Sequence, residues 1–269
     1  MKNPQHICII GAGAMGGAIA GALAIGAVKN DWKITVIARH MEKLEQLKRA
    51  HRLIGISTQY DSLTHADIVI IAVKPQSFDE LASEISSALN KNALLVSVMA
   101  GRSIGSIAKV FSNKRIVRAM PNLGAQFFES MTIWTGSGLT KKDTTFTKKV
   151  LSSIGEELCV TNEDLVDKAT AVSASGVGFL AYMTEAYIEE TEALGFSRED
   201  AERVVLQTLK ATNTILQKKE KTPEQLRVAV TSKAGTTEAG LSVLMGKSLR
   251  SIFERTFKKA YQRAKALAR

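Results

Sequence analysis

A glycine-rich stretch near the N-terminus has the spacing that binds phosphate groups in dinucleotide-binding proteins. It reads GAGAMG, which matches G-x-G-x-x-G, and it lies between the apolar run His6–Ile10 and the small-residue segment Ala14–Val28. A strand before the motif and a helix after it are the context that it requires. The first glycine makes the turn, the second lets a pyrophosphate approach, and the third lets helix and strand pack closely. The alternative is a glycine turn that binds nothing. The residues predicted to bind a dinucleotide here are Gly11, Gly13, Ala14, Met15 and Gly16.

The end of the second predicted strand indicates which dinucleotide binds. Proteins that bind NAD place an acidic residue there, on the ribose 2′-hydroxyl. This chain has Arg39 after the strand Lys33–Ala38, and no acid. A guanidinium forms charge-assisted hydrogen bonds to a phosphate, so Arg39 favours NADP(H) over NAD(H). The alternative is that Arg39 is a solvated loop cation.

Two further segments end apolar strands, at the edge of a parallel sheet where ligands bind. The first follows the strand Asp67–Val73 and the second closes the strand Ala93–Ala100. We expect both to line the cleft for the ribose and nicotinamide, although Lys74 by itself also fits a plain surface lysine. The residues concerned are Val73, Lys74, Pro75, Ala100 and Gly101.

Hydroxyl side chains in the second half of the chain are the candidates for substrate chemistry. Ser232, Thr236 and Thr237 lie where a helix is expected to begin, and a helix N-terminus with hydroxyls can bind a carboxylate. All four histidines lie within the first 65 residues, and no catalytic triad, paired-carboxylate or zinc motif is present. The sequence therefore predicts no metal. Taken alone, the segment also fits a capped turn between two helices.

The order of apolar patterns predicts an α/β fold with two parts. Strands alternate with helices through the first half, which indicates a Rossmann-type parallel sheet with helices on both faces. We expect further strands at 115–120, 131–135 and 156–160, and helices at 41–50, 76–89 and 103–111. Only helices are expected afterwards, at 164–174, 179–194, 198–217, 223–231 and 248–268. We place the border between a dinucleotide-binding domain, 1–161, and an all-helical domain, 162–269.

Composition narrows the remaining classes. Of 269 residues, 45% are hydrophobic and 23% charged, which excludes a disordered chain. No apolar run is long enough to span a membrane, no secretion signal is present, and two cysteines cannot build a disulfide framework. We therefore expect a cytoplasmic protein without a membrane partner. The net charge of +10 concentrates in the C-terminal helix. We interpret that helix as a solvated basic face, with nucleic-acid binding as the less favoured alternative.

Five segments together give the chain a resemblance to the pyrroline-5-carboxylate reductase family over essentially its full length. They are GAGAMG at 11–16, AVKPQ at 72–76, VRAMPN at 117–122, AVSASG at 171–176 and VTSKAGTTEAGL at 230–241. The last segment is the most diagnostic of the family. The resemblance implies reduction of 1-pyrroline-5-carboxylate, a cyclic imino acid, to L-proline with NAD(P)H. It also implies a homodimer through the helical domain, and larger rings such as a decamer.

The resemblance also implies roles for particular residues. The segment 232–237 is expected to bind the substrate carboxylate, with the hydroxyl of Thr237 near the ring nitrogen and Lys233 and Gly235 in contact with substrate. Asn122 is expected to border the nicotinamide. The other residues expected to wall the substrate pocket are Met120, Ser173, Ser175 and Gly176.

The chain departs from the family pattern at several loops. Lys233 and Ala234 replace a proline and a glycine, Val177 replaces a proline, and Leu123-Gly124 replaces Thr-Pro. Ala14 stands where asparagine is common. Such changes can alter a pocket because proline and glycine have special backbone preferences. Two alternatives therefore stay open: a reductase of a different cyclic imine, and a non-catalytic nucleotide-binding paralogue with a regulatory role.

Overall fold

The computed structural model describes residues 5–218, 221–246 and 249–267. By their internal contacts these residues form two compact units. The first unit runs up to Ser175 and includes the end of the last helix from Ala260, and the second runs from Gly176 to Lys259. The predicted domain border at 161/162 stays a prediction. The helix that follows this border packs on strands of the first unit.

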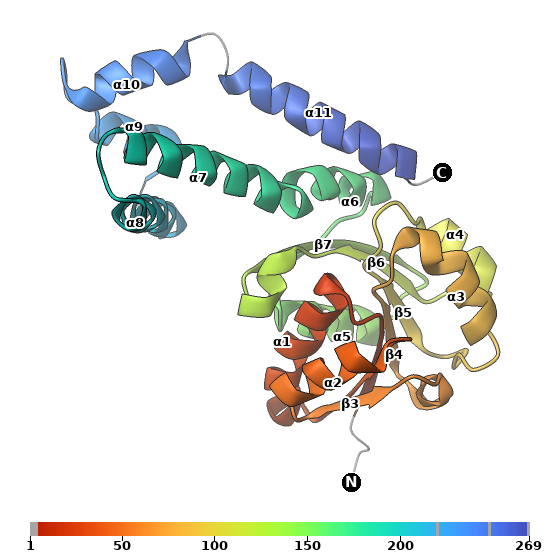
Figure 1. The fold of residues 1–269 in the computed structure, drawn as a ribbon. Coiled ribbons are helices and arrows are strands. Elements are labelled where there is room, and N and C mark those ends of the chain that lie inside the picture. Colours follow the sequence, from red (N-terminus) through yellow and green to blue (C-terminus); the bar gives the residue numbers. More distant parts are fainter. Residues whose placement is uncertain (1–4, 219–220, 247–248, 268–269) are drawn as a thin grey trace. The chain divides into compact units, whose positions relative to one another are not determined.

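The first unit is built on one sheet with the strand order β3-β2-β1-β4-β5-β6-β7-β8 (Figure 1). Its chain order reverses between β1 and β4, which is the switch point where doubly wound folds bind ligands. The strands are β1 (Gln5–Ile10), β2 (Trp32–Ile37), β3 (Ile54–Ser57), β4 (Ile68–Ile71), β5 (Leu94–Ser97), β6 (Ile116–Met120), β7 (Ser130–Ser137) and β8 (Gly155–Cys159).

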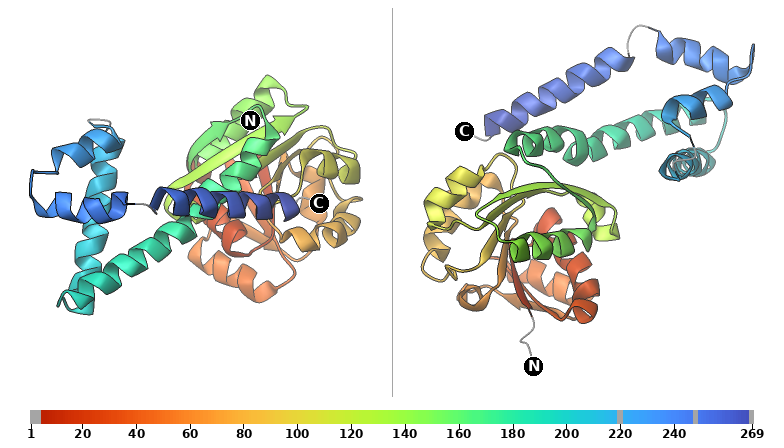
Figure 2. Two further views of the ribbon diagram at one scale, coloured as in Figure 1. Left: turned by 90° about the horizontal axis from the view of Figure 1, so that it is seen from above. Right: turned by 180° about the vertical axis from the view of Figure 1, so that it is seen from behind.

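Helices cover both faces of this sheet, as the sequence predicted (Figures 1 and 2). Along β1 the side chains alternate: Ile7 and Ile9 pack with α1, α2 and α5, whereas Cys8 and Ile10 pack with α3 and α4. The bounds are α1 (Ala14–Asn30), α2 (Met41–Ala50), α3 (Phe78–Ile85), α4 (Ile104–Phe111) and α5 (Lys141–Ser152). The predicted cap of α4 is confirmed, since the Ser103 side chain accepts a hydrogen bond from the N–H of Ser106.

The sheet differs from the prediction at its ends. β7 runs antiparallel to β6, and β8 runs parallel to β7. The reason is the short connection from Met120 to Ser130, because a parallel crossover needs a dozen or more residues. β3 and α5 were not predicted; β3 is a four-residue edge strand that contains Gly55 and is too short for a clear alternating pattern.

A buried ion-pair group joins α6 (Glu163–Ala169) to β6. Arg118 on β6 is almost fully buried and donates to Glu163 at 2.9 Å and to Asp167. Glu163 also accepts from the backbone N–H of Ile104 at the start of α4, at 2.8 Å. One carboxylate therefore positions β6, α6 and α4 together. Burying such charges is favourable only while each one keeps its partner.

The predicted helix 164–174 is interrupted. α6 ends at Ala169, and 170–174 forms a π-helical turn, η4, in which the N–H of Ser175 bonds to the carbonyl of Thr170. Such π turns are frequent at functional sites. Near α6, Asp164 accepts from Tyr261 at 2.6 Å and from Lys265 at 3.1 Å, which ties the end of α11 (Leu249–Leu267) to the first unit. These hydrogen bonds, with that from Lys168, lower the pKa of Asp164.

All the regular secondary structure that the structure describes in the second unit is helical, as predicted. Its helices are α7 (Gly176–Ala193), α8 (Arg198–Gln217), α9 (Pro223–Ala229), α10 (Thr236–Met245) and the first part of α11. Thr222 caps α9 with a capping box and Pro223 is its first residue, in agreement with the prediction. Positions 248 and 268, the predicted ends of the last helix, lie outside the described residues.

The buried ion pairs lead to a stability prediction. Asp167→Ala should lower the free energy of unfolding by about 3 kcal/mol, because it leaves the buried Arg118 guanidinium without one of its two carboxylates. Urea denaturation of the purified protein measures the change. Glu45→Ala, which removes one partner of the exposed Glu45–Arg49 pair, is the matched control and should change the value by about 0.5 kcal/mol or less. Equal effects of the two substitutions would contradict the structural role of Arg118.

Candidate functional site

A cavity of about 270 Å³ lies at the carboxyl edge of the sheet, beside the switch point. It brings together five of the predicted cofactor residues, Gly11, Gly13, Arg39, Val73 and Lys74. They follow β1, β2 and β4, and because these strands are parallel, their carboxyl ends meet at one edge. The cavity therefore lies where the sequence predicted a dinucleotide.

The three motif glycines meet three different requirements. Gly11 has φ +112°, and a Cβ there would lie 2.6 Å from the carbonyl oxygen of Ala72. A Cβ on Gly16 would lie 2.0 Å from the carbonyl oxygen of Gly11, so α1 reaches this position only without a side chain. At Gly13 a Cβ would meet nothing within 4 Å. Gly11 and Gly16 thus allow the backbone to pack, whereas Gly13 faces open space.

The start of α1 offers hydrogen-bond donors to an anion. Gly13 is the N-cap of a 17-residue helix, and no side chain caps it. The first N–H groups of a helix, here those of Ala14 and Met15, have no acceptor within the helix. Together with the helix dipole they favour a phosphate. The donor set and the space at Gly13 fit the pyrophosphate of a dinucleotide.

Arg39 lies at the rim of this cavity and is held by α3. Its Nη2 lies 2.9 Å from a carboxylate oxygen of Glu80 and 2.9 Å from one of Glu84. The hydrogen bond to Glu80 and the charges of both acids raise the pKa of Arg39. Tyr60, which also lines the cavity, donates its hydroxyl to Glu84 at 2.7 Å. Burial and this bond raise the pKa of Tyr60.

Sequence reasoning missed several residues of the cavity. Tyr60 follows the edge strand β3, so recognising that strand would have placed it at the same edge. Lys43 belongs to the first turn of α2 and adds a third cation to the lining, beside Arg39 and Lys74. Arg102 was also missed. It donates to the carbonyl of Pro75 at 3.0 Å and to Asp79, and thereby holds the loop that carries Lys74.

The other predicted cofactor residues do not line the cavity. Ala100 is half-buried, and Gly101 is buried with φ +75°. Asn122 is engaged by protein groups: its carbonyl oxygen accepts from the N–H of Gly124, and its amide donates to the hydroxyl of Ser173 at 3.1 Å. Ser173 in turn donates to the carbonyl of Met131 at 3.1 Å. The structure thus brings together two predicted site residues, Asn122 and Ser173, and links the end of β6 to η4.

The remaining substrate candidates are distributed over both units. Met120 is half-buried at the end of β6, Ser175 directly follows η4, and Gly176 begins α7. Ser232 and Lys233 are exposed in the loop before α10. Gly235 is the N-cap of α10, again without a capping side chain, and Thr236 and Thr237 are its first two residues. The N–H groups of that first turn therefore have no acceptor within the helix.

The loop before α10 has the backbone shape of a glycine loop although one glycine is missing. Ala234 adopts φ +57°, in the left-handed region that costs a residue with a side chain about 1–2 kcal/mol. Its N–H donates to the carboxylate of Glu238 at 2.7 Å. A Cβ on Gly235 would lie 2.2 Å from the hydroxyl oxygen of Ser232. The loop thus combines a left-handed turn at Ala234 with a close approach of Ser232 to Gly235.

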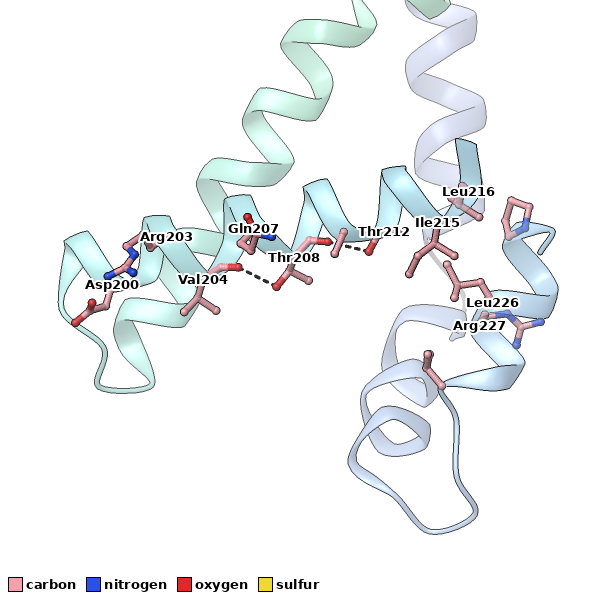
Figure 3. Close-up of a pocket in the computed structure, with 13 residues that line it drawn as sticks. Asp200, Arg203, Val204, Gln207, Thr208, Thr212, Ile215, Leu216, Leu226 and Arg227 are labelled. Carbon is pink, nitrogen blue, oxygen red and sulfur yellow. Dashed lines mark hydrogen bonds between the residues drawn. The ribbon is translucent and has the colours of Figure 1, made fainter. Parts of the chain in front are cut away.

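A larger apolar groove of about 830 Å³ lies in the second unit, between α8 and α9 (Figure 3). Val204, Ile215, Leu216 and Leu226 are among its lining side chains. None of the predicted catalytic, cofactor or substrate residues lines it. The helices of this unit and the turn after α7 also expose large apolar side chains, among them Leu180, Tyr182, Leu194, Val243 and Met245, each more than 60% exposed. Exposed apolar surface of this extent is typical of an interface between proteins.

Two absences concern only the described residues. Their His, Cys, Asp and Glu side chains form no group of three or more that is placed to hold a metal ion. None of their helices combines the length and the apolar character that crossing a membrane requires.

The glycines provide a prediction that separates packing from binding. Gly16→Ala should lower the free energy of unfolding by about 1–3 kcal/mol, because its Cβ collides with the backbone at Gly11. Gly13→Val should change it by about 1 kcal/mol or less, yet prevent NADPH binding by filling the space at the helix start. Thermal denaturation and an NADPH fluorescence titration measure the two effects. The prediction fails if Gly13→Val binds NADPH as the unmodified chain does.

Comparisons with known proteins agree with this geometry. Residues 163–267 match the family model described as pyrroline-5-carboxylate reductase dimerisation, and residues 6–101 match that described as NADP oxidoreductase coenzyme F420-dependent. The chain is 30% identical to a pyrroline-5-carboxylate reductase of Synechocystis over 261 residues, covering 97% of each protein. It is similar to the solved structure of the Coxiella burnetii pyrroline-5-carboxylate reductase, with a TM-score of 0.88, 30% identity, and coverage of 99% of this chain and 100% of that one.

A further solved structure, the Plasmodium falciparum pyrroline carboxylate reductase with NADP bound, has the same fold. Its TM-score is 0.87 at 24% identity, and the match covers all of both chains. The full-length match to the Synechocystis protein agrees with the motifs at the cavity and before α10. The chain belongs to the pyrroline-5-carboxylate reductase family.

Proposed function

We propose that this protein reduces 1-pyrroline-5-carboxylate to L-proline with NADPH, the last step of proline synthesis. The observation that carries the proposal is full-length similarity to pyrroline-5-carboxylate reductases, in a chain that keeps both a nucleotide cavity and an uncapped hydroxyl-bearing helix start. We propose 1–161 as the cofactor domain and 162–269 as the dimerisation and substrate domain, in the cytoplasm.

The residues before and at the start of α10 are proposed to bind the carboxylate of the substrate. The N–H groups of Thr236 and Thr237 have no acceptor within the helix, and the helix dipole favours an anion there. The hydroxyl of Ser232 and the ammonium of Lys233 add a donor and a positive charge in the same loop. A carboxylate bound here would orient the ring, and orientation supplies a large part of many barriers.

The reduction itself requires little acid–base chemistry from the protein. The bound cofactor supplies the hydride, which adds to the carbon of the C=N bond. A protonated imine already carries the positive charge that draws the hydride, so a strong general acid is not needed. The proposed role of Thr237 is to hold the ring nitrogen through its hydroxyl, with Ser173, Ser175, Gly176 and Met120 as proposed walls of the pocket. No histidine is required.

The residues that would hold the cofactor are those of the cavity at the carboxyl edge. The N–H groups at the start of α1 and the space at Gly13 would receive the pyrophosphate. Lys74, Pro75, Ala100, Gly101 and Asn122 are proposed for the ribose and nicotinamide side. We propose NADPH over NADH because Arg39 lies at the rim, where an NAD-binding chain would have an acid. The bound NADP of the Plasmodium protein supports this choice.

Self-association is supported by the dimerisation family model, which spans the helices with exposed apolar side chains. We propose a homodimer in which a second copy covers the α8–α9 groove, with a decamer as the larger assembly. Covering this groove would favour the dimer, because each Å² of apolar surface removed from water contributes about 25 cal/mol to the free energy of association.

The function is tested by NADPH oxidation with purified protein and 1-pyrroline-5-carboxylate. We expect imine-dependent oxidation at 340 nm with proline as product. Thr237→Val should lower kcat about tenfold or more and leave NADPH affinity unchanged, because the lost hydroxyl acts on the substrate. Thr145→Val, which removes an exposed hydroxyl that bonds only within α5, is the control. No imine-dependent oxidation by a chain that binds NADPH would contradict the proposal.

The cofactor choice is tested at Arg39. Arg39→Ala should raise KM for NADPH about tenfold or more, because charge-assisted bonds to the 2′-phosphate are lost, and change KM for NADH little. Arg49→Ala removes a cation of α2 that lies outside the cavity and should change neither. Equal effects of Arg39→Ala on both cofactors would rule out its contact with the 2′-phosphate.

A further inference from the structure

Two glutamates form ion pairs with Arg39, the cation that is proposed to select NADPH over NADH. Glu80 and Glu84 lie one turn apart on α3, and neither lines the cavity. Both bond to Arg39, and Glu84 also accepts from Tyr60. Two groups that line the cavity, Arg39 and Tyr60, therefore share Glu84 as a partner.

The group formed by Arg39, Glu80 and Glu84 does not by itself favour a phosphate, although Lys43 and Lys74 add positive charge elsewhere in the lining of the cavity. Two carboxylates face one guanidinium, so the three side chains together carry a net charge of −1. Arg39 is 51% exposed, Glu80 59% and Glu84 36%, so their interactions are screened by water but not lost. A 2′-phosphate that bonds to Arg39 must approach these carboxylates, whereas the 2′-hydroxyl of NADH brings no charge.

The geometry leaves Arg39 able to bind a phosphate despite the acids. Both ion pairs use the same nitrogen, Nη2. Neither ion pair uses Nε or Nη1 of Arg39. The guanidinium can therefore keep the carboxylates and still offer donors to a ligand. The acids then act through their charge on the ligand, rather than by blocking it.

We propose that Glu80 and Glu84 are specificity-determining residues that oppose the 2′-phosphate and so narrow the preference for NADPH over NADH. The inference rests on the proposed function in one respect, the assignment of Arg39 to the 2′-phosphate. It does not depend on which imine is reduced. If the acids instead helped to bind the 2′-phosphate by positioning Arg39, removing their charge would weaken binding of 2′,5′-ADP. The same experiment therefore distinguishes the two roles.

The experiment uses ligands that isolate the phosphate. Binding of 2′,5′-ADP and of 5′-AMP to the full-length protein is measured by titration calorimetry, for the unmodified chain, Glu80→Gln, Glu84→Gln and the double variant. Glutamine removes the charge and keeps one oxygen acceptor. At Glu84, whose two oxygens accept separately from Arg39 and Tyr60, one of these two hydrogen bonds loses its acceptor, so Glu80→Gln is the cleaner single variant. We expect each single variant to bind 2′,5′-ADP about two- to fivefold more tightly, as for exposed charge pairs. The double variant should bind 2′,5′-ADP about tenfold more tightly, and the affinity for 5′-AMP should stay unchanged in all variants.

Controls separate this effect from a general change in charge. Glu45→Gln removes one negative charge from α2, where Glu45 pairs with Arg49 away from the cavity, and should leave both affinities unchanged. The gain in the Glu80 and Glu84 variants should shrink at about 0.5 M salt, because salt screens exposed charges. Unchanged or weaker binding of 2′,5′-ADP in the double variant overturns the proposal. A failure of the proposed enzymatic function would show instead as missing imine-dependent oxidation, with these binding ratios intact.

Discussion

The close approach of α1 to the ends of β1 and β4 is the constraint on which the nucleotide cavity depends. Two positions tolerate no Cβ, because Gly11 faces the backbone of Ala72 and Gly16 faces the backbone of Gly11. The approach aims the start of α1 at the switch point of the sheet, where the loops after β1, β2 and β4 meet. Gly13 lies between these two packed positions, and a Cβ there would meet nothing within 4 Å. The proposed anion site at the start of α1 therefore depends on packing as well as on the helix dipole.

A second set of contacts fixes the positions of Asn122 and Ser173, two residues of the first unit that are proposed to contact cofactor or substrate. Arg118 joins β6 to α6, and its partner Glu163 also holds the start of α4. Two residues after the end of β6, Asn122 bonds to Ser173 of η4. The buried charges and the amide–hydroxyl contact thus determine where the loop after β6 and the π turn lie. A residue distant from the reacting atoms can in this way set the geometry of those that touch them.

The second unit gains little stability from its own core. Its buried cluster consists of Ile188, Ala201 and Val205, while many larger apolar side chains face outward. Small cores of this kind are marginal without a partner, which is consistent with a family model named for dimerisation. The same unit carries the start of α10, so proposed substrate binding and self-association reside in one set of helices. In the loop before α10, Ala234 adopts the left-handed backbone that glycine adopts most easily.

Local chemistry was sufficient to predict most elements and the nucleotide loop. Apolar strands that alternate with helices, the Ser103 and Thr222 caps and the glycine spacing all act over a few residues, so they are visible in the sequence. The antiparallel β7 depends on the length of its connection, and β3 was too short to recognise; missing it also meant missing Tyr60. The partners of Arg39 lie 41 and 45 positions away in the chain, and those of Arg118 lie 45 and 49 positions away.

The sequence by itself thus determined the fold class, the family and the types of residue available at the site. Only the tertiary structure decided which charged residues form ion pairs. It showed that Asn122 donates to Ser173 and that Glu80 and Glu84 both pair with Arg39. The physical reason is that ion pairs and side-chain hydrogen bonds act over a few ångströms in space, and no local pattern records which distant segments the sheet brings together.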